Sequence, residues 1–368
     1  MTKEVGSQVH ARTPRFRELD GLRGLAALSV VIGHFTATFS TFYPEAPGSL
    51  FDFAHGHFGV QLFFIISGFV ILMTAERAKR PTDFVISRVT RLYPAYWIAV
   101  ILSIFVGLLA NVPGTQLSVI DTLLNFTMVQ RLLLVPDVNG AFWTLAIEMQ
   151  FYAIVLVILV ATRCMLSDKL VQRLALVWLM ISVAVSVVAA VLSPDTSILN
   201  APVLLRALVN LTLAEYGPLF ALGMLLFIAR RNQRLGWAPV VAAGVATLSA
   251  GLLHSWGYAA AVAGISLAFT YVALRSSTPV LRFAPLLWLG KISYSLYIVH
   301  VVVGYALIDA LWPFLGRDLA NVLALGGVVL IAWALHTVAE EKLSPAWRKR
   351  WTAWRDRRVA ARSHGPVH

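Results

Sequence analysis

The sequence has few charged residues and almost no cysteine. Charged side chains make up 13% of its 368 residues, and Cys164 is the one cysteine. A single cysteine excludes an intrachain disulfide and any zinc cluster built from several thiolates. The scarcity of charge, with 58% hydrophobic residues and a mean hydropathy of +0.76, excludes an ordinary soluble domain of this length.

Signals that divide or process a chain are also lacking. No internal repeat or low-complexity linker separates domains, and no small-residue cleavage site accompanies the first apolar run. We therefore expect that run to be a retained helix and not a signal peptide. We expect three parts: a cytoplasmic N-terminal segment at 1–18, a transmembrane domain at 19–340 and a basic cytoplasmic tail at 341–368.

What the sequence has instead is a series of long uncharged runs. Each can cross a hydrocarbon core of about 30 Å as a helix, which takes about 20 apolar residues. The runs predict an all-α fold, a polytopic membrane helix bundle. About ten transmembrane helices are expected, at residues 22–40, 58–75, 93–110, 142–162, 171–192, 212–229, 237–253, 257–274, 286–308 and 319–339.

Basic residues outnumber acidic ones, with 30 Lys and Arg against 18 Asp and Glu and a net charge of +12. If the N-terminus is cytoplasmic, 27 of those 30 cations fall on the cytoplasmic side of the predicted spans. This bias is the positive-inside pattern, and an even number of spans returns the C-terminus to the cytoplasm. We therefore attribute the basic tail to topology and to contact with membrane lipid, and expect no nucleic-acid partner.

Arg23 and His34 lie eleven positions apart on the first predicted span. At about 100° per residue this separation is about three turns, so both side chains share one face, roughly 16 Å apart along the axis. Ionisable groups inside a membrane usually serve a function. The pair therefore predicts chemistry performed partway across the bilayer.

Five motifs follow one another along nearly the whole chain. They are LDGLRGLAALSVVIGHF at 19–35, GVQLFFIISGFVI at 59–71, FVISRVTRLYPAYW at 84–97, FWTLAIEMQFY at 142–152 and LGKISYSLYIVH at 289–300. In this order and spacing they resemble the acyltransferase-3 family, membrane-bound O-acyltransferases of the O-antigen and macrolide acyltransferase type. The short tail resembles the stand-alone form, which has no C-terminal esterase-like domain.

The resemblance implies an activity, a donor and an acceptor. It implies transfer of an acyl group, usually acetyl, from cytoplasmic acyl-CoA to a hydroxyl of a sugar, a glycan precursor or another small molecule. It also implies a bacterial inner-membrane location, no metal, and either a homo-oligomer or a separate extracytoplasmic transferase as a partner.

His34 and Glu148 are the predicted catalytic residues. A neutral imidazole can accept the proton of an attacking hydroxyl, so His34 is the expected general base. An acyl-His intermediate or a plain structural hydrogen bond is the alternative. We expect Glu148 to face His34 and orient its ring, because a carboxylate inside a membrane needs a partner.

Four cations are expected to bind the donor: Arg23, Arg88, Arg91 and Lys291. Arg88 and Arg91 are three residues apart and therefore neighbours on one helical face, with Pro94 at the start of the next span. Arginine binds phosphate groups through paired donors, as the phosphates of coenzyme A require. The alternatives are topogenic charge and, for Arg23, neutralisation of Asp20.

A further set of polar and aromatic residues is expected to line the substrate pocket. Tyr152 is four residues from Glu148, and Ser293, Tyr297 and His300 form a polar stripe at i, i+4 and i+7. Such a stripe either lines a cavity or makes interhelical hydrogen bonds. The complete set is Trp143, Tyr152, Ser67, Tyr93, Ser293, Tyr297 and His300.

Two other classes of protein remain open. A transporter or lipid or glycan flippase also places charges inside the membrane and would move its substrate without acyl transfer. A membrane scaffold without activity would give no reason to retain buried His34 and Glu148.

Overall fold

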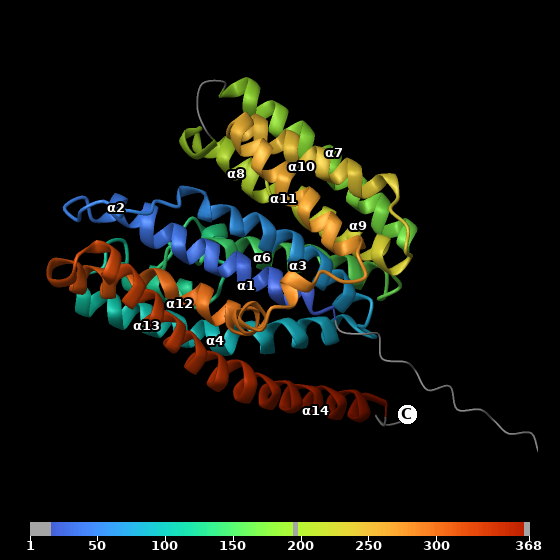
Figure 1. Cartoon of the computed structure of the whole chain (residues 1–368). Helices are drawn as coiled ribbons and strands as arrows, with labels where there is room; N and C mark the ends of the chain where they lie inside the picture. Colours follow the sequence, from blue (N-terminus) through green and yellow to red (C-terminus); the bar gives the residue numbers. More distant parts are fainter. Residues whose placement is uncertain (1–15, 194–197, 364–368) are drawn as a thin grey trace, which may run out of the picture.

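The computed structural model describes residues 16–193 and 198–363, and every regular element in these residues is helical (Figure 1). Its α-helices are α1 (Glu18–Gly33), α2 (Phe39–Phe42), α3 (Gly59–Ala75), α4 (Pro81–Ala110), α5 (Val119–Asn125), α6 (Trp143–Ala161), α7 (Asp168–Leu192), α8 (Val203–Thr212), α9 (Gly217–Arg231), α10 (Trp237–Leu253), α11 (Trp256–Leu274), α12 (Ala284–Leu315), α13 (Arg317–Leu335) and α14 (Ser344–Ser363). Two π-helices, His34–Thr38 and His336–Leu343, continue α1 and α13. The 3-10 helices are Ala54–Phe58, Gln130–Leu133, Ile198–Asn200 and Pro279–Arg282.

The prediction of an all-α membrane bundle is confirmed. Within the described ranges, nine helical stretches are long and apolar enough to cross a membrane. The remaining predicted span, 237–253, is the apolar helix α10, which has 17 residues. The placement of both termini in the cytoplasm stays a prediction.

The α4 helix begins earlier than its predicted span. Pro94, expected near a helix start, lies inside α4, and the helix begins at Pro81. The Asp83 carboxylate explains this start, because it accepts hydrogen bonds from the backbone N–H groups of Lys79 and Arg80 at 3.1 and 2.9 Å. Arg88 and Arg91 therefore stand on one helix with the membrane-spanning residues that follow them.

Glycines let two pairs of helices approach closely. A Cβ atom on Gly24 of α1 would lie 2.3 Å from the carbonyl oxygen of Leu286, and one on Gly290 of α12 would lie 1.8 Å from that of Asp20. Gly68 of α3 meets the Phe220 carbonyl of α9 in the same way. These contacts fix α1 against α12 and α3 against α9.

The helices form two groups (Figure 1). Helices α7, α8, α10 and α11 gather beside α9, and α1, α3, α4, α6, α12 and α13 form the other group. Contacts of α3 with α9 and α11 join the two. The tail predicted at 341–368 is helical over Ser344–Ser363, where α14 packs on α4 through an ion pair between Arg355 and Asp83 and a contact between Trp347 and Trp97.

Candidate functional site

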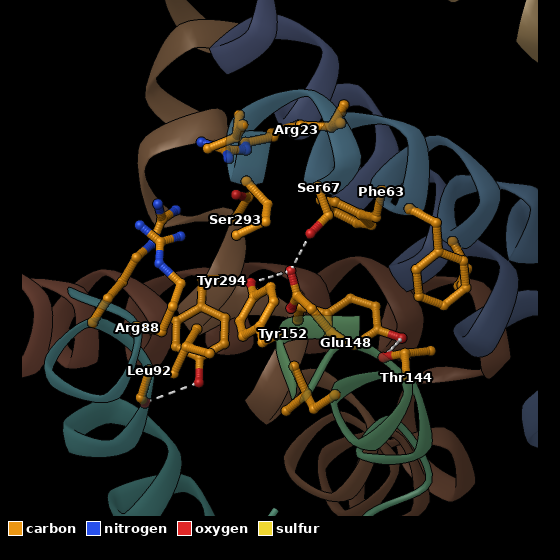
Figure 2. A pocket seen from close by; sticks show the side chains of 18 residues that line it. Arg23, Phe63, Ser67, Arg88, Leu92, Thr144, Glu148, Tyr152, Ser293 and Tyr294 are labelled. Atoms are coloured by element: carbon orange, nitrogen blue, oxygen red, sulfur yellow. Dashed lines mark hydrogen bonds between the residues drawn. The ribbon is translucent and has the colours of Figure 1, made fainter. Parts of the chain in front are cut away.

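A cavity opens between α1, α3, α4, α6 and α12 (Figure 2). It encloses about 760 Å³ of space, part of it open to solvent. Its lining combines cationic, polar and apolar side chains: Arg23, Val60, Phe63, Phe64, Ile66, Ser67, Val70, Ile71, Arg88, Arg91, Leu92, Thr144, Leu145, Glu148, Tyr152, Ser293, Tyr294 and Tyr297. A largely apolar pocket with few, convergent polar groups is typical of a small-molecule site.

Three arginines from two helices reach this cavity, Arg23 from α1 and Arg88 and Arg91 from α4. Arg88 is 8% exposed, and its Nη2 donates to the hydroxyls of Ser87 at 3.0 Å and Thr74 at 3.4 Å. Its buried Nε has no hydrogen-bond partner. A buried, unsatisfied donor is costly, so this guanidinium is suited to an anionic ligand.

Glu148 lies on the cavity wall and is held by two hydroxyls. Its Oε1 accepts a hydrogen bond from Ser67 Oγ at 2.6 Å and another from the Tyr152 hydroxyl at 2.5 Å. Figure 2 shows Ser67 directed at the carboxylate from α3. Arg23 lines the same cavity, so a carboxylate and a cation face the same space.

Tyr297 closes one part of the cavity. Its hydroxyl hydrogen-bonds to Thr144 Oγ1 at 2.9 Å, and its ring centroid lies 5.6 Å from that of Phe63. The same ring lies 5.6 Å from His300, which is fully buried behind it. Tyr297 therefore contacts both the cavity and His300 beyond it.

His34 and His300 form a pair outside the cavity lining. The two ring centroids are 4.9 Å apart in a T-shaped contact, and His300 Nε2 lies 3.4 Å from His34 Nδ1. His34 Nδ1 also contacts the carbonyl of Val30 at 2.9 Å, and His300 Nδ1 that of Tyr297 at 2.7 Å. Because a carbonyl oxygen only accepts, each Nδ1 carries a proton, and Nε2 of His34 is left as the basic nitrogen.

The π-helix that begins at His34 is held from outside by a buried arginine. Arg317 of α13 is 3% exposed and donates from Nη2 to the Phe35 carbonyl. Its guanidinium lies 3.8 Å from the centroid of the Phe39 ring. Short π-helices interrupt α-helices often at functional positions, and this one sets where the His34 ring points.

The expected contact between Glu148 and His34 is not formed. Glu148 is bonded to Ser67 and Tyr152, whereas the partners of His34 are Val30 and His300. The reason is helix packing: α6 lies against α3 and α4, while α1 lies against α12 and α3, so α1 and α6 share α3 as a neighbour. The expected catalytic pair is therefore two separate groups.

Other predicted residues also divide between the cavity and its surroundings. The cavity brings together Arg23, Ser67, Arg88, Arg91, Glu148, Tyr152, Ser293 and Tyr297. Three others lie outside its lining. Lys291 is exposed, Tyr93 donates to the Thr127 carbonyl at 2.8 Å, and Trp143 packs against Tyr216 and Arg131.

Sequence reasoning missed Thr144, Phe63 and Tyr294 as lining residues. Thr144 precedes Glu148 by four residues, so helical spacing already placed both on one face. Phe63 precedes Ser67 by the same interval. Among the described residues, no group of three or more His, Cys, Asp or Glu side chains is placed to hold a metal ion.

Comparison with known proteins supports the motif analysis. Residues 16–337 match the model of a family described as an acyltransferase domain. The chain is 32% identical over 109 residues to the exopolysaccharide production protein ExoZ of Rhizobium meliloti, covering 28% of this chain and 34% of that protein. It is 29% identical over 193 residues to YrhL of Bacillus subtilis, whose name includes "peptidoglycan O-acetyltransferase", covering 47% of this chain and 28% of that protein.

The chain thus spans about a third or less of the length of these relatives. No solved structure matches it. The family match covers most of the chain, including the cavity and the histidine pair. The chain therefore belongs to the acyltransferase domain family, as a multi-pass membrane member.

Proposed function

We propose that this protein is an O-acyltransferase of the bacterial inner membrane. It transfers an acyl group, preferentially acetyl, from cytoplasmic acyl-CoA to a sugar or glycan hydroxyl. The observation that carries the proposal is the cavity, in which three arginines and a hydrogen-bonded carboxylate meet among membrane-spanning helices. A cavity of this composition suits a ligand that has phosphates at one end and an apolar arm at the other.

The arginines suit the phosphates of the donor. Arg88 has an unpartnered Nε buried against the cavity, and Arg23 and Arg91 add positive charge to the same lining. Figure 2 shows Arg23 and Arg88 on the side of the cavity away from Thr144. We place the phosphates at this arginine side and the thioester near Ser67 and Glu148, which the pantetheine arm is long enough to reach.

His34 acts as the general base toward the acceptor. The Val30 carbonyl holds the Nδ1 proton, so Nε2 can take the proton of an acceptor hydroxyl as the oxygen attacks the acyl carbonyl. His300 Nε2 lies beside the Nδ1 proton and stabilises the charge that the His34 ring then gains. The names of the two relatives, for exopolysaccharide production and peptidoglycan O-acetylation, favour a sugar acceptor.

Purified protein in lipid nanodiscs, supplied with labelled acetyl-CoA and a panel of saccharides, tests this function. We expect label to move to a saccharide, and His34→Ala to reduce the rate by about 100- to 10,000-fold. His55→Ala, which changes an exposed histidine, is the matched control and retains the wild-type rate.

Tight binding of acetyl-CoA without any transfer or hydrolysis would contradict the enzyme assignment. Movement of a labelled saccharide across sealed vesicles without consumption of acetyl-CoA would establish the transporter alternative instead.

A further inference from the structure

We infer that Ser67 is a second catalytic residue: the nucleophile that takes the acyl group from the donor thioester, with Glu148 as its base. The acyl group then passes from Ser67 to the acceptor hydroxyl. This inference rests on the proposed function, and it divides the reaction into two half-reactions that use different parts of the molecule.

The geometry of Ser67 is that of an activated nucleophile. Such a site needs a nucleophile within hydrogen-bond reach of a base, and a third group that orients the base. Ser67 Oγ donates to Glu148 Oε1 at 2.6 Å, and the Tyr152 hydroxyl donates to the same oxygen at 2.5 Å. The proton that must leave Ser67 is therefore already directed at a fixed carboxylate.

Ser67 combines two features that other buried serines of the described residues have singly or not at all. Ser293 also lines the cavity but donates to the Gly290 carbonyl, and Ser295 donates to Glu340 but lies outside the lining. The hydroxyls of Ser182, Ser186, Ser249 and Ser266 have no hydrogen-bond partner. Ser67 is on the lining and has a carboxylate partner. The neighbouring Gly68 packs on the Phe220 carbonyl of α9, which fixes the backbone and keeps Ser67 facing the cavity.

The position of His34 sets what the second half-reaction requires of the acceptor. His34 and His300 lie beyond Tyr297, outside the described cavity lining, whereas Glu148 is bonded to Ser67. Acyl-Ser67 stays beside Glu148 when CoA leaves, and CoA vacates the cavity. The acceptor must then occupy the space between Ser67 and Tyr297 for its proton to reach His34.

In the first step Ser67, Glu148 and Arg23 account for the proton and the charge that move. The Oγ–H proton of Ser67 passes to Glu148 as Oγ bonds to the thioester carbonyl carbon, and Arg23 supplies positive charge for the developing oxyanion. The C–S bond then breaks and the thiolate takes the proton from Glu148. The products are acyl-Ser67 and free CoA thiol.

In the second step His34 Nε2 takes the proton of the acceptor hydroxyl, whose oxygen attacks the ester carbonyl of acyl-Ser67. The bond between the carbonyl carbon and Ser67 Oγ breaks, and the proton returns to Oγ. The enzyme is restored, and the net reaction transfers one acyl group in exchange for one proton.

The experiment uses the full chain in nanodiscs with labelled acetyl-CoA and no acceptor. We expect a burst of about one CoA per chain and covalent label on the peptide that contains Ser67. His34→Ala still forms this acyl-enzyme but does not discharge it when acceptor is added. Ser67→Ala gives no label and lowers transfer by about 1,000-fold or more, and Ser266→Ala behaves as wild type.

Two further measurements separate a catalytic role from a structural one. Ser67→Ala should bind acetyl-CoA within about twofold of wild type, because the arginines remain. Ser67→Cys should carry its label as a thioester that neutral hydroxylamine releases, and Cys164 is the single native cysteine to be distinguished from it.

Transfer by Ser67→Ala at the wild-type rate, or a wild type that transfers without any burst or label, would overturn the inference and leave the proposed function standing. A wild type that transfers no acyl group at all would overturn the proposed function itself.

Discussion

The cavity and the histidine pair accommodate polar groups inside the membrane in different ways. In the cavity, Arg23, Glu148 and Ser67 face shared space and satisfy one another or await a ligand. In the pair, His34 and His300 are satisfied mainly by backbone carbonyls of their own helices. The comparison teaches that charge gathers where a charged donor is expected, while the predicted base sits apart, with a backbone carbonyl and a second histidine as its partners.

The largest effect is expected for a substitution in the histidine pair, at His34. His34→Ala should lower the turnover rate by about 100- to 10,000-fold while the Kd for acyl-CoA, measured by titration calorimetry, stays within about twofold. The reason is that His34 lies outside the cavity lining. A tenfold weaker donor affinity in this variant would show that the histidine pair and the cavity are one site.

The second-largest effect is expected in the cavity, at Arg88. Arg88→Ala should weaken acyl-CoA binding by about 10- to 100-fold, because a charge-assisted hydrogen bond contributes about 1.5–3 kcal/mol. Arg88→Lys should recover only part of the affinity, since lysine lacks the paired donors. Arg173→Ala on the exposed face of α7 is the control. Unchanged donor affinity in Arg88→Ala would place the phosphates elsewhere.

A smaller effect is expected at His300, which we propose acts through His34 as a positioning residue. His300→Phe removes the contact at His34 Nδ1 and should lower kcat by about tenfold, or 1.4 kcal/mol, without changing the donor KM. His300→Asn should regain part of the rate by restoring a polar partner. The pH dependence of kcat should shift in His300→Phe, and an unmoved profile would make its role purely one of packing.

The smallest effect is expected for the hydrogen bond between Tyr297 and Thr144, where the cavity adjoins the histidine pair. Tyr297→Phe and Thr144→Val each delete the hydrogen bond between these residues, worth about 1 kcal/mol, and should change the transfer rate by about fivefold. Thr144→Val also removes the contact of Thr144 Oγ1 with the Ala141 carbonyl. The double variant should be no worse than Thr144→Val alone, because both changes remove the shared bond. Tyr271→Phe on α11 is the exposed control. Additive losses would mean that the two residues act independently.

The membrane helices, and the pairs of site residues that share one helix face, could be predicted from the sequence. Long apolar runs predict the membrane helices because hydrocarbon thickness fixes their length. The spacing of Glu148 and Tyr152 predicts their shared face, and the hydrogen bond between them follows from it. The spacing of Ser293 and Tyr297 likewise places both on the cavity lining.

The partner of His34 could not be predicted in this way. Periodicity says which residues share a face of one helix, but it carries no information on which helices are neighbours. The sequence alone suggests His34 as the partner of Glu148, and only the packing of α6 against α3 reveals Ser67 in that place. The early start of α4 could be predicted from the sequence, because Pro81 and Asp83 form a helix-start signal.

The glycine contacts between α1 and α12 have a consequence for motion. Even one added methyl group at Gly290 would collide with the Asp20 carbonyl, so the two helices cannot slide past each other without breaking this seam. Arg23 lies on α1 and His34 on the π-helix that continues it, and Tyr297 and His300 lie on α12. The seam therefore fixes Arg23 and His34 along the helix axis relative to Tyr297 and His300. We expect this helix pair to stay rigid when a ligand enters, unlike the rocking of whole halves by which transporters alternate access.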